Sequence, residues 1–426
     1  MACRILKTVG GELKERGWAY GILVIITLTW IGMGEYMAAC AVFFFVAALF
    51  FADRRHIVVS DTPFLLLLCA FTLNNVVSSL LSVDRATSAA LSLLWFLVIL
   101  IPVASVRFSL DGNDDFVMRL ILPFSIGAAV VIVAYMSIGF GITLAREGLA
   151  FRRYSFKWLG TSQTADTMVM LGCLGYGWFR QKRAETHRWL GFVYLLMCAF
   201  GLFLTLDRGG IAAYFVVMII LLAHDWKRLI LLFVLLAVLV FLSYKIESLH
   251  VLRYPFDYLT ARYRFEIVKS GQQIDTFRTS WLIIRDHWLL GVGTNNFSKF
   301  TKEYGNGHWY AYAHNFILQF WAENGIFGMG FGLSIMGLVI SRFFRALKHS
   351  SSRYVVLGTG CAFIGMLLEN LTNSTIWIIK IALPFWLIAG MLCHFYRSSE
   401  IQRKNPPVRE SLVRRFFTTG GGRSTT

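Results

Sequence analysis

The stretch from His314 to Gly328 joins a titratable imidazole and several amides to the start of a strongly apolar segment. Asn315, Gln319 and Glu323 follow one another at intervals of four residues. Residues at this spacing share one face of a helix, and a polar face must contact protein or water instead of lipid. Because histidine has an ordinary pKa of about 6.5, it suits general-base chemistry at neutral pH. We therefore predict a base at His314, with a polar stripe behind it that forms a hydrogen-bond network between helices.

Arginines are prominent in two long polar connections, 141–160 and about 247–313. The planar guanidinium binds phosphate oxygens through two parallel hydrogen bonds, so a set of arginines is typical of a site for a phosphorylated ligand. Ordinary solvated loop charge, paired with nearby carboxylates, is the alternative for any single member. The cations are Arg146, Arg152, Arg153, Lys157, Arg253, Arg262, Arg264, Lys269, Arg278 and Arg285.

A charged pair, Asp207 and Arg208, interrupts the apolar sequence and is followed by Gly209 and Gly210. Charges between membrane segments are costly, which makes this pair a candidate for function. The two glycines allow a bulky head group to approach the backbone closely. Alternatively, the pair only caps and turns two helices at the lipid surface.

The sequence gives no pattern for a metal or a cofactor. Six of the seven cysteines lie within apolar runs, and no pair has the spacing of metal ligands. The segment 290–297 contains a Gly-Val-Gly turn, but it lacks the Gly-Lys-Ser/Thr of a phosphate-binding loop and the third glycine of a dinucleotide-binding loop. We expect neither a metal nor a cofactor.

Long apolar runs must position these residues. The chain has 426 residues, of which 57% are hydrophobic and 15% charged, and its mean hydropathy is +0.61. A helix needs about 20 apolar residues to cross the bilayer core. We therefore predict an all-α polytopic membrane protein with about twelve transmembrane helices. The runs are about 18–34, 36–52, 62–82, 87–106, 116–140, 162–179, 189–206, 210–224, 228–246, 314–342, 353–371 and 376–396.

Lysines and arginines are concentrated in the N-terminal residues and in every second connection, as the positive-inside rule requires of cytoplasmic segments. This pattern predicts cytoplasmic termini and an outer loop of about residues 247–313 between helices 9 and 10. We expect residues 1–404 to form one transmembrane domain and 405–426 a disordered cytoplasmic tail. Because topology accounts for the net charge of +17, no nucleic-acid partner is expected.

Within the outer loop, residues 275–288 predict an amphipathic helix. Phe277, Trp281, Ile284 and Trp288 recur at helical spacing. Such a stripe is typical of a helix that lies in or near the membrane interface.

The segment His314-Asn315, nine residues, Gly325, two residues, Gly328 resembles the signature of the bacterial O-antigen ligases, within the superfamily of O-antigen ligases and polymerases. The predicted topology is similar as well, with about twelve spans, cytoplasmic termini and the largest periplasmic loop just before the signature. The resemblance covers the topology of the whole chain, whereas the match of residues is confined to short motifs. It implies a GT-C-like fold in the bacterial inner membrane, with an active site that faces the periplasm.

The resemblance also implies an inverting, metal-independent glycosyl transfer in lipopolysaccharide biosynthesis. The donor is O-antigen polysaccharide on undecaprenyl diphosphate, and the acceptor is a sugar hydroxyl of lipid A-core. His314 matches the signature histidine, proposed to deprotonate that hydroxyl. Arg208 matches the arginine of the family's Arg-Gly segment and Arg278 resembles the loop arginine before the Gly-x-Gly turn; both are expected to hold the diphosphate. Because Arg278 lies about one helical turn closer to this turn than in the family, Arg264 or Arg285 could take its role.

Two other functions stay open at this point. An O-antigen polymerase shares the fold and the donor but transfers to another lipid-linked oligosaccharide, and acceptor choice depends on the shape of a cavity. A transporter or flippase of lipid-linked sugars belongs to a different class, which often has an internal repeat and places its substrate near the bilayer midplane. Against that class, the sequence lacks a recognisable repeat, and its polar residues concentrate on one side of the membrane.

Overall fold

The computed structural model describes residues 62–109, 122–147, 153–156, 159–182, 184–223, 225–245, 271–305 and 307–404, and its regular elements there are all helical. Ten of the twelve predicted runs coincide with a helix. The runs 18–34 and 36–52, the tail 405–426 and residues 246–270 of the outer loop, Arg264 included, lie outside the described residues. The elements are α3 (Thr62–Leu80), α4 (Arg85–Ser109), α5 (Leu122–Glu147), α6 (Thr161–Gln181), α7 (Glu185–Thr205), α8 (Arg208–Leu222), α9 (Trp226–Lys245), α11 (Gly271–His287), α12 (Phe297–Tyr304), α13 (Phe316–His349), α14 (Arg353–Glu369), the short 3₁₀-helix η4 (Thr375–Trp377) and α15 (Ile379–Lys404).

Six of the described helices are long and apolar enough to cross a membrane, which supports a polytopic membrane protein. A seventh, α8, is apolar but shorter. The six candidate spans are Thr62–Leu80, Arg85–Val103, Leu122–Thr143, Glu185–Thr205, Phe316–His349 and Ile379–Ile401.

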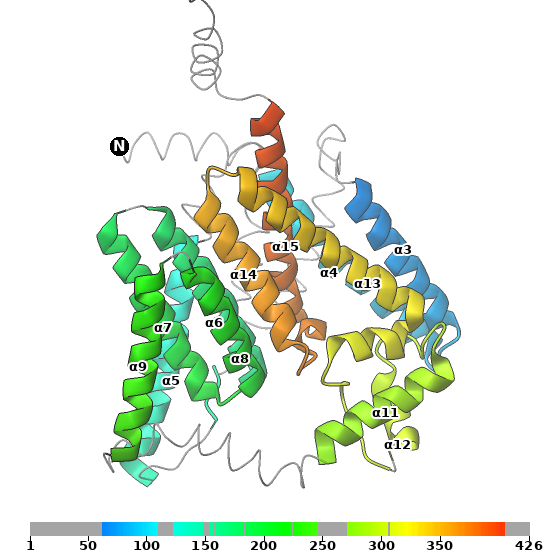
Figure 1. Ribbon diagram of the computed structural model, residues 1–426. Helices are drawn as coiled ribbons and strands as arrows, with labels where there is room; N and C mark the ends of the chain where they lie inside the picture. The colour runs from blue at the N-terminus through cyan, green and yellow to red at the C-terminus, as the bar shows by residue number, and fades with distance from the viewer. Residues whose placement is uncertain are drawn as a thin grey trace, which may run out of the picture.

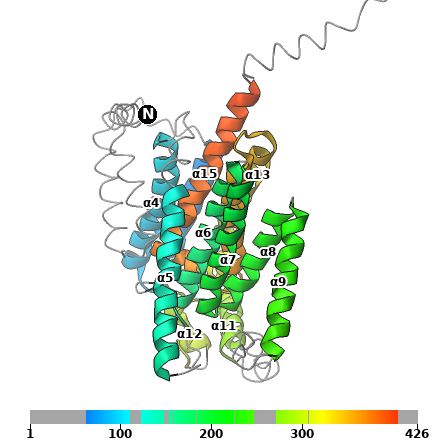
Figure 2. The same ribbon diagram turned by 90° about the vertical axis from the view of Figure 1, so that its left-hand side faces the viewer.

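Successive helices run up and down, so that their connections gather at two ends of the molecule (Figure 1). The links α6–α7, α8–α9 and α13–α14 lie at the end from which α15 leaves. At the other end are the α7–α8 link, the connection from α14 to η4, and the start of α13 beside α11 and α12. A view turned by 90° shows the same alternation for α5 to α9 (Figure 2).

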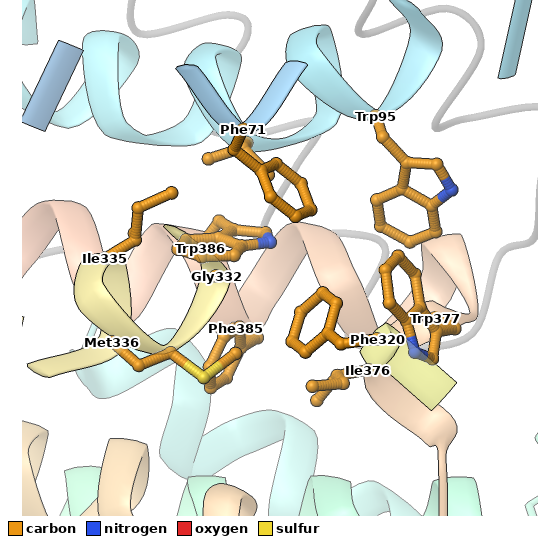
Figure 3. Close-up of a pocket in the computed structure, with 11 residues that line it drawn as sticks. Phe71, Trp95, Phe320, Gly332, Ile335, Met336, Ile376, Trp377, Phe385 and Trp386 are labelled. Carbon is orange, nitrogen blue, oxygen red and sulfur yellow. The ribbon is translucent and has the colours of Figure 1, made fainter. Parts of the chain in front are cut away.

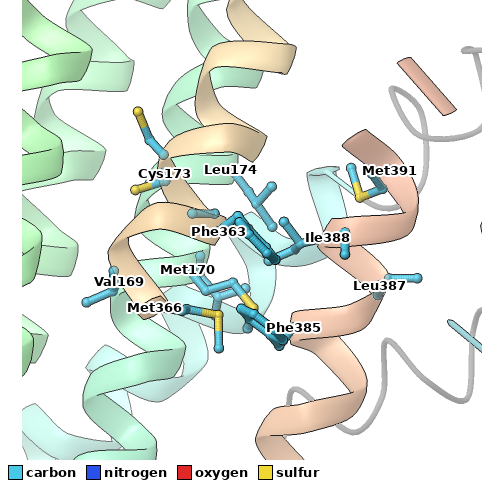
Figure 4. Packing of buried hydrophobic residues seen from close by; sticks show 14 of the residues in the cluster. Val169, Met170, Cys173, Leu174, Phe363, Met366, Phe385, Leu387, Ile388 and Met391 are labelled. Atoms are coloured by element: carbon cyan, nitrogen blue, oxygen red, sulfur yellow. The ribbon is translucent and has the colours of Figure 1, made fainter. Parts of the chain in front are cut away.

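The core of the bundle is centred on α14, which packs against α6, α8, α13 and α15. Two glycines let α14 and α6 approach closely, because a Cβ on Gly177 would lie 2.7 Å from the Tyr354 carbonyl oxygen and one on Gly358 only 2.5 Å from that of Cys173. The Phe363 ring on α14 stacks on that of Phe385 on α15, with ring centroids 4.7 Å apart (Figure 4).

At the end where α15 leaves, buried arginines are paired within the protein. Arg180 lies 3.7 Å from the Asp225 carboxylate, while Arg228 pairs with both Asp225 and Glu185. The Arg228 guanidinium also lies 4.9 Å from the centre of the Trp189 ring. Buried charges are tolerated only with such partners, so these cations serve the packing of α6, α7 and α9.

The described part of the outer loop folds as α11 and α12, which pack on one another and on α13. The amphipathic helix predicted at 275–288 is confirmed by α11. Its stripe faces mostly outward, since Phe277, Trp281 and Trp288 are exposed, whereas Ile284 is buried.

Candidate active site

His314 lies in the turn directly before α13 and has a left-handed backbone conformation, with φ of 53°. Few residues other than glycine adopt this conformation, so the surrounding contacts must hold it. The side chain is half-buried. Loss of hydration disfavours the imidazolium and lowers the pKa of His314 below its ordinary value, although a hydrogen bond with the Asn373 side chain acts in the opposite direction. At neutral pH the ring is therefore neutral and able to accept a proton.

Asn315 caps α13 and joins it to the residues after α14. Its Oδ1 accepts hydrogen bonds from two backbone N–H groups of the first helical turn, at 2.9 and 3.0 Å. Its Nδ2 donates to the Leu371 carbonyl at 2.9 Å, and the Phe316 backbone N–H donates to the Asn370 carbonyl at 3.0 Å. These hydrogen bonds hold the start of α13 against residues 370–374. We call residues 370–374 the α14–η4 turn.

Buried carboxyl and amide groups support the α14–η4 turn. Glu369 accepts hydrogen bonds from Asn373 Nδ2 at 2.7 Å and from Asn370 Nδ2 at 3.1 Å. The Asn370 Nδ2 also lies 3.3 Å from the Asp166 carboxyl of α6, while its Oδ1 accepts from Thr375 Oγ1 at 3.0 Å. The Asp166 carboxyl also accepts a hydrogen bond from the Thr375 hydroxyl of η4. Groups from α6, α14 and η4 therefore fix this turn together.

Arg208 begins α8 on another side of the α14–η4 turn. Asp207 caps the helix by accepting from the Gly210 backbone N–H at 3.1 Å, and its second oxygen accepts from Ser162 Oγ at 2.6 Å. Gly209 lies so close to the turn that a Cβ there would be 2.0 Å from Thr372 Oγ1. His314 and Arg208, which are far apart in the sequence, hence border the same few residues. Asp207 caps a helix, as one of the sequence interpretations has it. Gly209 makes its close approach to Thr372 of the protein itself, and an approach of a head group to the backbone stays a prediction.

Arg278 stands apart from this turn. It is exposed on α11, the helix that packs on α12 and α13. Arg285 is exposed on the same helix and forms a salt bridge with the adjacent Asp286 at 2.8 Å. The described residues therefore gather His314 and Arg208 but leave the choice of loop arginine as a prediction.

Helix α13 is interrupted at Gly325, where φ is 68° and ψ is −174°. Only glycine adopts this region readily. The peptide groups freed by the break bond to the Gly-Val-Gly turn: the Val292 N–H donates to the Ala322 carbonyl at 2.9 Å, and the Gly293 N–H to the Glu323 carbonyl at 2.8 Å. The glycines of the two sequence motifs thus meet in one backbone junction.

Gln319 and Glu323 are buried next to this junction and serve as hydrogen-bonding groups. Gln319 Oε1 accepts from the Ala313 backbone N–H at 2.7 Å, and Gln319 Nε2 donates to Glu323 at 2.9 Å. Glu323 also accepts from the Phe297 backbone N–H at 3.3 Å. The stripe therefore ties the loop to α13, as the interpretation of a structural network expects.

Three polar residues of this region escape the sequence analysis. Asp166 supports the α14–η4 turn, while Asn74 and Ser78 of α3 donate to the carbonyls of Asn324 and Glu323, at 2.8 and 3.0 Å. The only local signal is a polar residue inside an apolar run, which marks a buried partner without identifying it.

An apolar pocket lies beside the α14–η4 turn, among α3, α4, α13 and α15 (Figure 3). The Trp377 ring of η4 meets Phe320 and Trp95 edge to face, with centroids 4.6 and 5.0 Å away. Ile376 lines the same pocket. An aromatic and aliphatic lining of this kind suits a hydrocarbon chain. The α14–η4 turn therefore has polar groups on one side and apolar groups on the other.

The arrangement can move a proton and attract an anion. A neutral imidazole accepts a proton, and an arginine at a helix N-terminus combines its own charge with the positive end of the helix dipole. Across the described ranges, no three His, Cys, Asp or Glu side chains are placed to share a metal ion.

Comparison with known proteins gives one family match. Residues 192–333 match the family model described as O-antigen ligase. The matched segment contains Arg208, Arg278 and His314 and ends within α13, before the α14–η4 turn begins. A search of curated proteins finds no match. The signature at His314 lies within the matched segment, so the two findings agree in their similarity to the O-antigen ligases and polymerases.

Proposed function

We propose that the protein is an O-antigen ligase of the bacterial inner membrane, with both termini in the cytoplasm and its active site facing the periplasm. It transfers O-antigen polysaccharide from undecaprenyl diphosphate to a sugar hydroxyl of lipid A-core. The match of residues 192–333 to the O-antigen ligase family model supports this function at the level of the class.

The observation that carries the proposal is the meeting of His314 and Arg208 at one turn. Asn373 of the turn contacts His314, and Thr372 of the turn packs against Gly209, which follows Arg208. The reaction needs a base for the acceptor and a cation for the diphosphate at nearby positions, and these two residue types supply them. The basic, ion-paired cluster of Arg180 and Arg228 lies at the other end of the bundle, in accord with a cytoplasmic location for that end.

In the proposed reaction, the unprotonated nitrogen of His314 removes the proton from the acceptor hydroxyl. The acceptor oxygen forms a bond to the anomeric carbon on the face opposite the diphosphate, and the bond from that carbon to the diphosphate oxygen breaks. Attack from the opposite face inverts the configuration. The leaving diphosphate takes the electron pair, and Arg208 and Arg278 stabilise its charge without a metal ion.

Reconstitution with two acceptors tests this function. The purified protein is placed in liposomes with undecaprenyl-diphosphate-linked polysaccharide, and receives either lipid A-core or an undecaprenyl-linked oligosaccharide. We expect polysaccharide to be transferred to lipid A-core. Elongation of the undecaprenyl-linked acceptor alone would instead identify a polymerase. Movement of the donor across the bilayer with no covalent change would identify a transporter.

A further inference from the structure

We propose that Asn373 is a positioning residue that fixes the tautomer and direction of the His314 ring. The inference rests on the proposed function of His314 as a base and adds a residue outside the segment matched by the family model.

Hydrogen bonds to Glu369 set the orientation of the Asn373 amide. Its Nδ2 donates to Glu369 Oε1 at 2.7 Å, and Asn370 Nδ2 donates to the other oxygen of Glu369 at 3.1 Å. Because both oxygens of Glu369 accept from amides, the NH₂ group of Asn373 must face Glu369. The carbonyl oxygen of Asn373 is thereby left to face His314, which the bonds of Asn315 and Phe316 to the Leu371 and Asn370 carbonyls hold beside this turn, and we assign the contact with the ring to that oxygen.

The Asn373 carbonyl in turn determines the tautomer of the His314 imidazole. A carbonyl oxygen only accepts hydrogen bonds, so the ring nitrogen that meets Asn373 must carry the proton. In the neutral ring the other nitrogen then has the free lone pair that removes a proton from the substrate. Without this partner, both neutral tautomers of His314 would be populated. In one of them the lone pair points away from the acceptor hydroxyl of the substrate.

Other hydrogen bonds hold the α14–η4 turn together. Asn370 and Thr375 bond one another at 3.0 Å, Thr372 Oγ1 donates to the Glu369 carbonyl at 2.9 Å, and Asn315 holds the Leu371 carbonyl. These contacts do not involve the Asn373 side chain. We therefore expect the α14–η4 turn to form when that side chain is shortened.

The surroundings also determine which charges His314 senses. Glu369 acts through Asn373, with Asp166 behind it on α6, while Asp207 and Arg208 begin α8 on another side of the turn. Replacing Asn373 by Asp sets a carboxylate against the imidazole and strengthens the imidazolium. Replacing it by Ala removes an acceptor and weakens the imidazolium.

The test compares Asn373→Ala and Asn373→Asp with wild type, and with Lys302→Ala as a control on the exposed surface of α12. Transfer to lipid A-core is measured as kcat and KM over pH. In parallel, diethyl pyrocarbonate labels the unprotonated histidines at each pH without substrate, and mass spectrometry quantifies the label on the His314 peptide.

Asn373→Ala should lower kcat about 10- to 100-fold with little change in KM for the donor, and its labelling midpoint should move to lower pH. Asn373→Asp should keep more of kcat and move the midpoint to higher pH. Lys302→Ala should match wild type. Wild-type kcat and labelling in Asn373→Ala would overturn the proposal, as would an unmoved midpoint in Asn373→Asp. If wild type transfers nothing to either acceptor, the proposed function fails, whereas the labelling midpoints still decide whether Asn373 controls the ring.

Discussion

The polar residues at the start of α13 and those at its break are used in different ways. At the break, the carbonyls of residues 322–324 bond to the Gly-Val-Gly turn and to α3, while Glu323 and Gln319 bond to the loop. At the start, Asn315 makes the structural bonds, and the half-buried ring of His314 lies against Asn373. The polar residues of this region therefore have two roles. Those at the break hold the loop in place, and those at the start leave the His314 ring able to react.

This difference predicts that His314→Ala removes activity and leaves the fold intact. Loss of a general base lowers kcat about 100- to 10,000-fold, while the cap at Asn315 still begins the helix. Transfer to lipid A-core and the detergent unfolding midpoint are measured together. Wild-type transfer in this variant would break the assignment, and a large loss of stability would show that His314 belongs with the structural residues.

Arg208 sharpens the contrast between the arginines. Arg208→Ala should reduce transfer roughly 10- to 1,000-fold and weaken binding of undecaprenyl diphosphate, because a preorganised cation is lost. Arg208→Lys should restore only part, since lysine lacks the planar fork. Arg278→Ala and Arg285→Ala form a matched pair on α11. A larger effect at Arg285 would transfer the role from Arg278, and unchanged donor binding in all of these variants would move the phosphate site elsewhere.

Gly325→Ala tests the junction. A Cβ there would lie 2.1 Å from the Leu289 carbonyl oxygen, in a backbone region reserved for glycine. Strain and overpacking together should cost roughly 2 to 5 kcal/mol of stability. Gly330→Ala is the control, because its Cβ meets no atom within 4 Å. Unfolding in detergent measures both, and equal stability would contradict the strained break.

The smallest expected effect is that of pH. Only the neutral ring of His314 accepts a proton, so transfer should fall as pH drops through its pKa. Burial lowers that pKa, which sets the midpoint of the acidic limb below about pH 6.5, the ordinary value. The kcat profile of wild type checks this. A midpoint above pH 7 would mean that a different group is the base.

Much of the helical fold could be predicted because long apolar runs favour helices. The runs 162–179 and 189–206 correspond to α6 and α7 with ends displaced by a few residues. The prediction was less complete for the run 314–342. The helix continues to His349, because the basic residues Arg342, Arg345 and Lys348 end an apolar run but do not end a helix. The helix is also interrupted at Gly325, where it packs against the Gly-Val-Gly turn of another segment.

The site could be predicted only in part. His314 and Arg208 stand out by residue type and place, whereas the role of Asp166 depends on contacts between segments distant in sequence. Asp166 is an isolated acid in an apolar run, and nothing near it indicates that Thr375 and Asn370 are its partners. Tertiary packing sets these pairs. Local periodicity carries no information about them.

The close crossing of α6 and α14 at Gly177 and Gly358 has a consequence for biosynthesis. A ribosome completes α6 long before α14, so the glycine face of α6 stays without this partner until a helix near the end of the chain has been made. The α14–η4 turn, which borders both His314 and Arg208, follows α14 directly. Nascent chains that stop before residue 370 therefore lack an assembled site, even though they already contain the whole segment matched by the family model.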